Sequence, residues 1–163
     1  MNISLSDKIK KEIDSIRNKF PDDQNKSSII ESLLIIQHES NGYLTSELIE
    51  SLADYLNVQK IDVYEVATFY SMFSLKPIGK NIISVCTNVS CMLRNSDQIV
   101  NYIEKKLKVK IGESTKDNKF YLKDEMECLA ACNGAPMMQV NHINYENLTY
   151  EKIDKILDGI KDD

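Results

Sequence analysis

The chain has 163 residues, of which 42% are hydrophobic, and its 20 basic and 25 acidic side chains give a formal net charge of −5 at pH 7. This length predicts one large domain or two small ones with a real hydrophobic core. The acidic charge argues against nucleic-acid binding, which usually needs a basic face. No segment holds the about 18 consecutive apolar residues of a membrane span, and the N-terminus lacks the apolar core of a secretion signal, so we expect an intracellular protein.

Residues 1–76 carry apolar side chains at helical spacing, which predicts a small bundle of helices with short connections. The four expected helices cover residues 9–20, 28–40, 45–56 and 62–70. Their expected start signals are the capping box Ser28-x-x-Glu31, Thr45 and Asp62-x-x-Glu65, and the expected stop signals are Pro21 and Asn41-Gly42. The aromatic residues at the end of this segment are expected to pack in the core rather than to bind a partner; they are Tyr64, Phe69, Tyr70 and Phe73.

Residues 77–163 change character, because strand-like and helical segments alternate along them. The expected elements are a strand at 82–86, a helix at 99–107, strands at 120–122, 137–140 and 143–145, and a helix at 150–160. Asn141-His142 predicts a tight hairpin turn, and Thr149 is the expected cap of the last helix. This order predicts a mixed sheet with helices packed on it. We therefore expect a fold of the α+β or α/β class, with a helical domain at 1–76 and a second domain at 77–163.

The four cysteines form two close pairs, Cys86-x4-Cys91 and Cys128-x3-Cys132, which we expect on loops that follow strands. Four thiolates can hold a zinc ion or an iron–sulfur cluster, or they can pair as two disulfides. Structural zinc sites usually use tighter C-x2-C pairs. Wider loops suit a two-iron cluster, in which each iron needs its own pair of thiolates. Disulfides require an oxidising compartment, which nothing in the sequence supports.

The chemistry of such a cluster predicts what should surround it. With two ferric ions, two sulfides and four thiolates it carries a charge of about −2, which N–H donors and nearby cations must stabilise. Candidate donors flank the pairs, and they are Thr87, Asn88, Ser90, Asn133 and Gly134. Arg94 could oppose the negative charge or simply begin a helix at the surface, and Glu125 and Glu127 would lower the reduction potential. Ligation by thiolates alone predicts a potential of about −400 mV.

Other cofactor sites have no support in the sequence. His38 and His142 are expected at the surface and not as metal ligands, because four cysteines already complete a cluster. The five glycines form neither a G-x-G-x-x-G nor a P-loop pattern, so the chain shows no means to bind a nicotinamide or flavin by itself.

Four segments, in this order, resemble the thioredoxin-like [2Fe–2S] subunit of respiratory complex I, the family of the bacterial NADH-quinone oxidoreductase E subunit and of mitochondrial flavoprotein 2. They are QHESNGYL from Gln37, VATFYSMF from Val66, VCTNVSCMLR from Val85 and ECLAACNGAPM from Glu127. The resemblance implies a helical bundle followed by a thioredoxin-like ferredoxin domain. It also implies that Cys86, Cys91, Cys128 and Cys132 ligate one [2Fe–2S] cluster of the N1a type. Asn95 and Ala130 stand where this family commonly has glycine, and Ala130 would cost about 1 kcal/mol if its φ is positive.

The resemblance further implies an electron-transfer subunit of an NADH dehydrogenase (quinone) of the respiratory chain, without a complete catalytic site of its own. Its expected partners are the subunit that binds FMN and NADH, on which the helical domain would dock, and other subunits of the peripheral arm. The expected location is cytoplasmic and peripheral to the inner membrane, or on the matrix side in an organelle. Two alternatives stay open: the equivalent subunit of a flavin-dependent hydrogenase or formate dehydrogenase, and a zinc-stabilised interaction module without a redox role.

Overall fold

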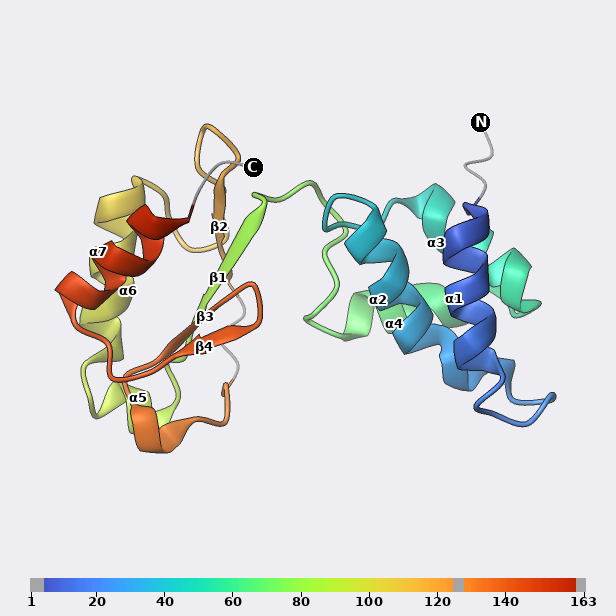
Figure 1. Cartoon of the computed structure of the whole chain (residues 1–163), viewed down its shortest axis with the longest axis horizontal. Coiled ribbons are helices and arrows are strands. Elements are labelled where there is room, and N and C mark those ends of the chain that lie inside the picture. The colour runs from blue at the N-terminus through green and yellow to red at the C-terminus, as the bar shows by residue number, and fades with distance from the viewer. Residues whose placement is uncertain (1–4, 125–127, 161–163) are drawn as a thin grey trace. The chain divides into compact units, whose positions relative to one another are not determined.

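The chain consists of two compact units, Met1–Pro77 and Ile78–Asp163, and each has its own hydrophobic core (Figure 1). The computed structural model describes residues 5–124 and 128–160. None of the helices in these two stretches is long and apolar enough to cross a membrane.

The first unit is helical, as the spacing of its apolar residues predicted. Its elements are α1 (Asp7–Arg17), the 3-10 turn η1 (Asn25–Ser28), α2 (Ile29–Glu39), α3 (Ser46–Leu56) and α4 (Lys60–Phe69). Fully buried aliphatic side chains from α1, α2 and α3 meet in its core, among them Ile13, Leu33 and Leu52. Burying each such side chain contributes about 1.5–3 kcal/mol, which is how three- to four-turn helices become stable together.

The predicted start at Thr45 is confirmed, the start at Ser28 is right in position but lacks its predicted capping box, and the start at Asp62 is wrong. Thr45 caps α3, because its hydroxyl accepts the Leu48 N–H at 3.3 Å. Ser28 instead donates its hydroxyl to the Asn25 carbonyl at 2.7 Å and so completes the turn η1, so no capping box forms. Helix α4 begins at Lys60, before the predicted Asp62.

The aromatic run was only partly predicted. Phe73 is buried and Tyr64 packs against the core, but Phe69 is 81% exposed and Tyr70 is also exposed, which corrects the expectation of core packing for these two. The reason is helix geometry. Phe69 follows the buried Ala67 by two residues and therefore lies about 200° around the helix axis from it. At Tyr70 the backbone is already extended (φ −89°, ψ 122°), so the apolar stripe ends there.

The second unit is a four-stranded mixed sheet with the strand order β2-β1-β3-β4. Its strands are β1 (Asn81–Val85), β2 (Phe120–Leu122), β3 (Met138–Val140) and β4 (Ile143–Tyr145). The central strand β1 pairs with β2 in parallel and with β3 antiparallel, and β3 pairs with β4 antiparallel. These positions confirm the predicted strands.

Helices α6 (Ser96–Leu107) and α7 (Tyr150–Gly159) cover one face of this sheet (Figure 1). Thr149 caps α7 as predicted, because its hydroxyl accepts the Lys152 N–H at 3.2 Å. Gly79 lets the chain enter β1 beside β2, since a Cβ there would lie 2.4 Å from the backbone carbonyl carbon of Phe120. Two short elements, α5 (Val89–Met92) and the 3-10 turn η2 (Cys132–Gly134), complete the unit.

The hairpin between β3 and β4 turns at Asn141-His142, as predicted. Both residues have positive φ, 49° and 68°, as a two-residue hairpin turn of type I′ requires. Asn141 also ties the turn to β1, because its Oδ1 accepts the Ile82 N–H at 2.9 Å and its Nδ2 donates to the Asn81 Oδ1 at 2.7 Å. This side chain thus fixes both the turn and the end of the central strand.

We predict that Asn141→Ala lowers the free energy of unfolding of the second unit by about 2 kcal/mol, because it removes two hydrogen bonds and places a Cβ-bearing residue without a local partner at positive φ. Urea titration followed by circular dichroism measures this change. His142→Gly is the matched control from the same turn, and we expect it to change the free energy by less than about 0.5 kcal/mol or to raise it. Equal losses in the two variants would contradict the role assigned to Asn141.

Candidate functional site

The four cysteines come from two regions that the fold of the second unit brings together. Cys86 directly follows β1, and Cys91 lies in α5. Cys128 lies in the connection after β2, and Cys132 begins η2. All four are free thiols, so the disulfide alternative does not match this structure. The expectation of loop positions needs one correction, because Cys91 sits in a one-turn helix that sequence reasoning missed.

The sulfur atoms of the two regions are in contact. The Cys86 sulfur forms hydrogen bonds with the thiols of both Cys91, its sequence neighbour, and Cys128, from the second pair. Cys91 also interacts electrostatically with Cys132. Cys86 and Cys91 are buried with Ala135 and Met137, whereas Cys128 and Cys132 are exposed. One side of the thiol cluster is therefore covered by protein, and the other side reaches the surface.

Backbone N–H groups point at the two buried sulfurs. The N–H groups of Leu129 and Asn88 donate to Cys86, and the N–H of Met137 donates to Cys91. Asn88 confirms a donor that the sequence suggested. Leu129 and Met137 were missed, because a main-chain donor leaves no mark in the side-chain pattern. Gly134, another suggested donor, gives its N–H to the Ala131 carbonyl at 3.0 Å instead.

These contacts shift the pKa values of the two buried thiols in opposite directions. Burial alone would raise the pKa of Cys86, but the N–H donors of Leu129 and Asn88 and the neighbouring thiols outweigh it, so the pKa is lowered. Burial, together with the bond to Cys86, raises the pKa of Cys91 to about 11. Cys86 is thus the acceptor of the pair and Cys91 its S–H donor. Ionising the Cys91 thiol at neutral pH therefore requires a positively charged centre beside it.

The donor set suits a two-iron cluster. Such a cluster distributes four thiolates over two metal ions, and four convergent free thiols with backbone N–H groups on two of them fit that chemistry. A tetrahedral zinc site would instead gather its ligands around one ion. Within residues 5–124 and 128–160, no three histidine, cysteine or acidic side chains are grouped as ligands of one metal ion, the four cysteines included, so the choice of a cluster over zinc rests on the spacing of the two pairs.

The loops around the thiols contain two non-glycine residues at positive φ. Ala130, between the second pair, has a φ of 56°, and Asn95, just before α6, has a φ of 63°. The steric cost of alanine at positive φ therefore applies to Ala130, and it is about 1 kcal/mol relative to glycine. Asn tolerates this conformation better, because its side chain can bond locally. Gly134 is needed for close approach, since a Cβ there would lie 2.4 Å from the Glu146 Cβ.

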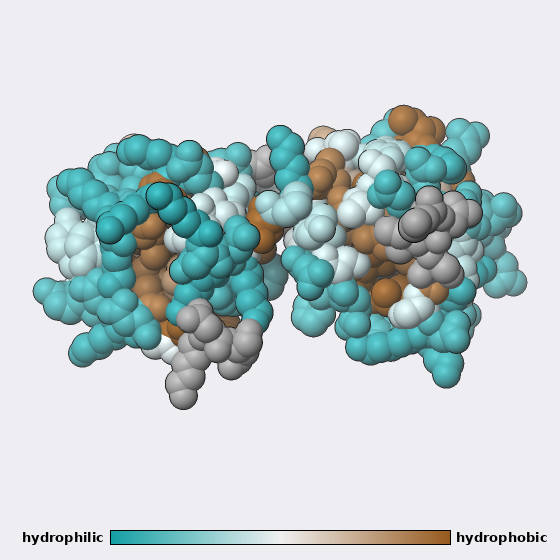
Figure 2. All heavy atoms as spheres, turned by 90° about the horizontal axis from the view of Figure 1, so that it is seen from above, coloured by the Kyte–Doolittle hydropathy of each residue, from teal (hydrophilic) through white to brown (hydrophobic). Residues whose placement is uncertain are grey.

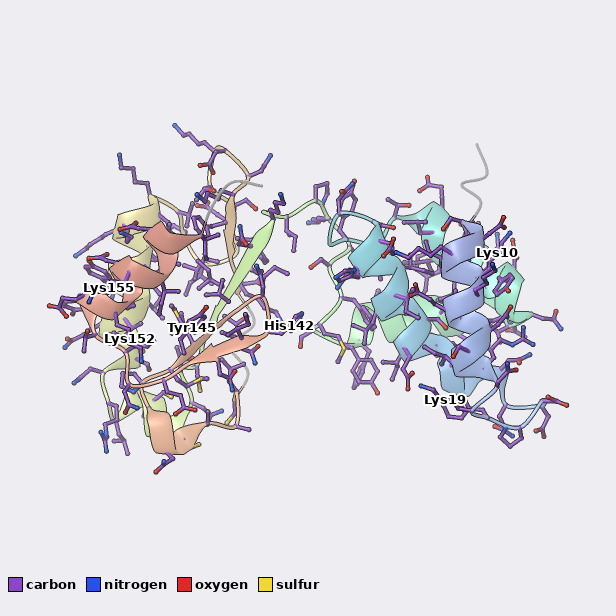
Figure 3. All side chains as sticks on the ribbon, in the orientation of Figure 1. Lys10, Lys19, His142, Tyr145, Lys152 and Lys155 are labelled. Carbon is purple, nitrogen blue, oxygen red and sulfur yellow. The ribbon has the colours of Figure 1, made fainter. Side chains whose placement is uncertain are left out.

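The remaining residues singled out in the sequence lie away from the thiols or outside the described residues. His142 lies at the tip of the β3–β4 hairpin, well apart from α5 (Figure 3). His38 lies on the surface of the first unit, with its Nδ1 3.9 Å from the Glu39 carboxylate. Arg94 is exposed and lines a cavity of about 330 Å³. Glu125 and Glu127 lie outside the described residues.

Known proteins resemble this chain along nearly its whole length. The chain is 44% identical over 162 residues to the NADH-quinone oxidoreductase E subunit of Rickettsia bellii (strain RML369-C), a match that covers 99% of this chain and 92% of the relative. It is 38% identical over 149 residues to the mitochondrial NADH dehydrogenase [ubiquinone] flavoprotein 2 of Dictyostelium discoideum, a match that covers 91% of this chain and 60% of the relative.

A solved structure shares the fold. The crystal structure of an NAD⁺-reducing [NiFe]-hydrogenase in the air-oxidized state matches with a TM-score of 0.65 at 19% identity. The match covers 79% of this chain but only 23% of the hydrogenase chain, so the fold there is part of a much longer polypeptide.

The family follows from these matches and from the fold. Residues 13–161 match the thioredoxin-like [2Fe-2S] ferredoxin family, which agrees with the helical unit, the mixed sheet and the convergent thiols. The chain belongs to the thioredoxin-like [2Fe–2S] ferredoxins, and within them to the group of NADH-quinone oxidoreductase E subunits.

Proposed function

We propose that this chain is an electron-transfer subunit of an NADH-quinone oxidoreductase of the respiratory chain, complex I, and that it holds one [2Fe–2S] cluster. The observation that carries the proposal is the convergence of the four thiols, with backbone N–H donors on the two that are buried. Membership in the group of E subunits supports the assignment to this enzyme. A protein with this role is peripheral to the inner membrane, on its cytoplasmic side or on the matrix side of an organelle.

The proposed ligands are Cys86, Cys91, Cys128 and Cys132. We assign Cys86 and Cys91 to one iron and Cys128 and Cys132 to the other, because two cysteines that are close in sequence can reach the same iron with little strain. When bound, the cluster accepts and releases one electron at a time. The chain itself supplies the four thiolates and the backbone N–H groups that stabilise the charge on two of them. It also buries those two, Cys86 and Cys91, away from solvent.

The chain depends on a partner for hydride chemistry. Oxidation of NADH needs a two-electron acceptor such as a flavin beside the nicotinamide, and this sequence has no glycine-rich dinucleotide loop. We therefore assign FMN and NADH to a partner subunit of the same complex, with further contacts to other subunits of the peripheral arm. The chain contributes to an enzyme without having a complete catalytic site.

A second candidate is the equivalent subunit of a flavin-dependent hydrogenase or formate dehydrogenase. The fold shared with an NAD⁺-reducing hydrogenase favours it, but the identity to that chain is 19%, against 44% to an NADH-quinone oxidoreductase E subunit. Copurification from the native source would separate the two, because the partners would be either quinone-reductase subunits or a hydrogenase. A zinc-stabilised interaction module is the other alternative, and metal analysis would recognise it.

The helical unit carries none of the proposed ligands, and we assign to it a docking role on the flavin-binding subunit. Its surface supports this role, because the end of α4 and the segment after it expose large apolar side chains at Phe69, Met72 and Leu75. Gln37 holds this segment in place by two hydrogen bonds. Its Oε1 accepts the Ser74 N–H at 2.7 Å, and its Nε2 donates to the Met72 carbonyl at 3.0 Å.

We predict that anaerobically purified protein contains equal amounts of iron and acid-labile sulfide, and that dithionite produces an electron paramagnetic resonance signal of spin one-half. Replacing any one of the four cysteines by Ser should destabilise or alter the cluster, because one iron then lacks a thiolate. His142→Ala is the control, and we expect its spectrum to be unchanged. Stoichiometric zinc without sulfide in the wild type would reject the proposed cluster.

The isolated chain should not oxidise NADH, since it has no flavin to accept the hydride. Stopped-flow mixing of the cluster-loaded, flavin-free chain with NADH, followed at the absorbance of NADH, tests this. Adding the FMN-binding subunit should allow NADH to reduce ferricyanide. NADH consumption that scales with the concentration of the isolated chain would show that it has a nucleotide site of its own.

We further predict that residues 77–163 alone assemble the cluster, because this unit has its own core and all four cysteines. The fragment should bind the flavin-binding subunit more weakly than the full chain, since two linked contact surfaces bind more tightly than one. Biolayer interferometry with both proteins measures the difference. Binding of the fragment at full strength would show that the helical unit has no docking role.

A further inference from the structure

The two pairs of thiols differ in how far solvent reaches them. Cys86 and Cys91, here called the inner pair, are 3% and 1% exposed. Cys128 and Cys132, the outer pair, are exposed at the surface. Met137 is fully buried and packs against the inner pair. A cluster that reaches the empty chain from solvent therefore meets the outer pair first.

The exposure of the outer pair is a more specific signal than exposed apolar surface. Apolar residues show between polar side chains in both units (Figure 2), and in the second unit they occur in several places, among them Leu93, Ile111 and Ile143. Such residues are ordinary on a protein surface. Cysteine, in contrast, is among the residue types that are most often buried. Two exposed thiols in one short segment therefore indicate a role that needs access from solvent.

The inner pair is held in place by the main chain. The Cys86 N–H donates to the Met137 carbonyl at 3.1 Å, and the Met137 N–H donates to the Cys91 sulfur. Within α5, which carries Cys91, the Met92 N–H donates to the Asn88 carbonyl at 2.8 Å. Displacing either inner cysteine would break bonds that belong to the sheet or to α5.

The outer pair lies on a segment whose backbone bonds are local. In η2, the Gly134 N–H donates to the Ala131 carbonyl at 3.0 Å, and the Ala135 N–H donates to the Cys132 carbonyl at 3.3 Å. A bond to another loop follows the pair, where the Gly134 carbonyl accepts the Asn147 N–H at 2.6 Å. The segment before Gly134 can therefore shift without loss of the sheet.

The contact between the two pairs must open when a cluster enters. The Cys86 sulfur is hydrogen-bonded to the Cys128 thiol, but in the proposed assignment these two cysteines bind different irons. Two sulfur atoms in direct contact leave no room for iron and sulfide ions between them. Because the sheet fixes the inner pair, the outer pair is the one that moves away. That movement disturbs the thiol contact and the Leu129 N–H bond to Cys86, but not the pairing of β1 with β3.

We propose that the outer pair is the entry site of the cluster: Cys128 and Cys132 capture a [2Fe–2S] cluster from a thiolate-ligated donor, and Cys86 and Cys91 complete its ligation afterwards. This proposal rests on the proposed function. It adds the side from which the cluster enters and the order in which the four cysteines act.

The reaction is an exchange of thiolate ligands. Cys128 and Cys132 each lose a proton, form a bond to one iron and displace a thiolate of the donor, which takes up the proton. Cys86 and Cys91 then displace the two remaining donor thiolates from the other iron in the same way. Four iron–sulfur bonds form and four break. No electron is transferred, so the exchange needs neither an oxidant nor a reductant.

The test compares two full-length variants that each keep one pair of thiols. Cys86→Ser with Cys91→Ser leaves only the outer pair, and Cys128→Ser with Cys132→Ser leaves only the inner pair. Each cluster-free, reduced protein is mixed anaerobically with a [2Fe–2S] cluster ligated by four glutathiones. Visible circular dichroism follows uptake by the protein, and native mass spectrometry counts the glutathiones that stay bound.

We expect the variant that keeps the outer pair to capture the cluster and to retain two glutathiones, because its second iron has no protein thiolate. The variant that keeps the inner pair should capture the cluster at least about tenfold more slowly, because its thiols are buried. The wild type should displace all four glutathiones. Capture at equal rates by the two variants would overturn the proposed entry site.

A measurement on the wild type does not depend on the folding of the variants. Brief treatment of the cluster-free chain with iodoacetamide, followed by peptide mass mapping, should modify Cys128 and Cys132 at least about tenfold faster than Cys86 and Cys91. Protein alkylated only on the outer pair should then fail to capture the cluster, although its inner pair is free. Modification of all four thiols at similar rates would show that the inner pair is equally open and would overturn the entry site.

The outcomes separate the entry site from the proposed function. The second donor is a [2Fe–2S] cluster on a cysteine-ligated scaffold protein. If the wild type takes up a cluster from neither donor and the native protein holds no iron and sulfide, the function and the entry site both fail. If it takes up none although the native protein holds both, the entry site alone fails. If the outer pair captures the cluster from the scaffold protein only, the order of the ligands stands and the donor is a protein.

Discussion

The structure of the second unit depends on one electrostatic constraint, which is that four sulfur atoms able to carry negative charge must lie together. Burial and neighbouring negative charge both disfavour ionisation, and the structure shows this conflict at Cys91, whose pKa is raised to about 11 by burial first and by the neighbouring thiols second. The fold meets the constraint with main-chain N–H groups rather than with cationic side chains. Donors from Leu129, Asn88 and Met137 reach the buried sulfurs, and Arg94 is directed to the surface, where its charge is available to a partner.

The sheet places these donors. Cys86 continues the line of β1, and its own N–H donates to the Met137 carbonyl at 3.1 Å, extending the antiparallel pairing of β1 with β3 by one step. That bond positions Met137, whose N–H in turn points at Cys91. The central strand pair is therefore the frame of the thiol site, and the hairpin at Asn141 supports the other end of the same pair.

Much of this could be predicted from the sequence, and the errors have physical reasons. Alternating apolar residues indicated the strands at 120–122 and 143–145, and Asn141-His142 indicated the turn, because few residue pairs tolerate positive φ twice. Ser28 forms no capping bond to α2, and its hydroxyl instead donates to the Asn25 carbonyl within η1. Phe69 failed as a core residue because it lies on the opposite side of α4 from the buried Ala67, and Tyr70 failed because the helix ends before it. The N–H groups of Leu129 and Met137, which donate to the sulfurs, could not be predicted from the sequence, because every residue type except proline offers the same backbone donor.

The segment between Cys128 and Cys132 shows how the constraint is met locally. The Leu129 N–H donates to Cys86, and the next residue, Ala130, has a φ of 56°. Glycine would adopt this conformation without steric cost, whereas alanine loses about 1 kcal/mol there. The contacts of a charged site outweigh such a loss, because a hydrogen bond to an ionised group contributes about 1.5–3 kcal/mol. The strained residue therefore persists where the surrounding bonds fix its backbone, and the same bonds that hold the thiol site determine the shape of the loop.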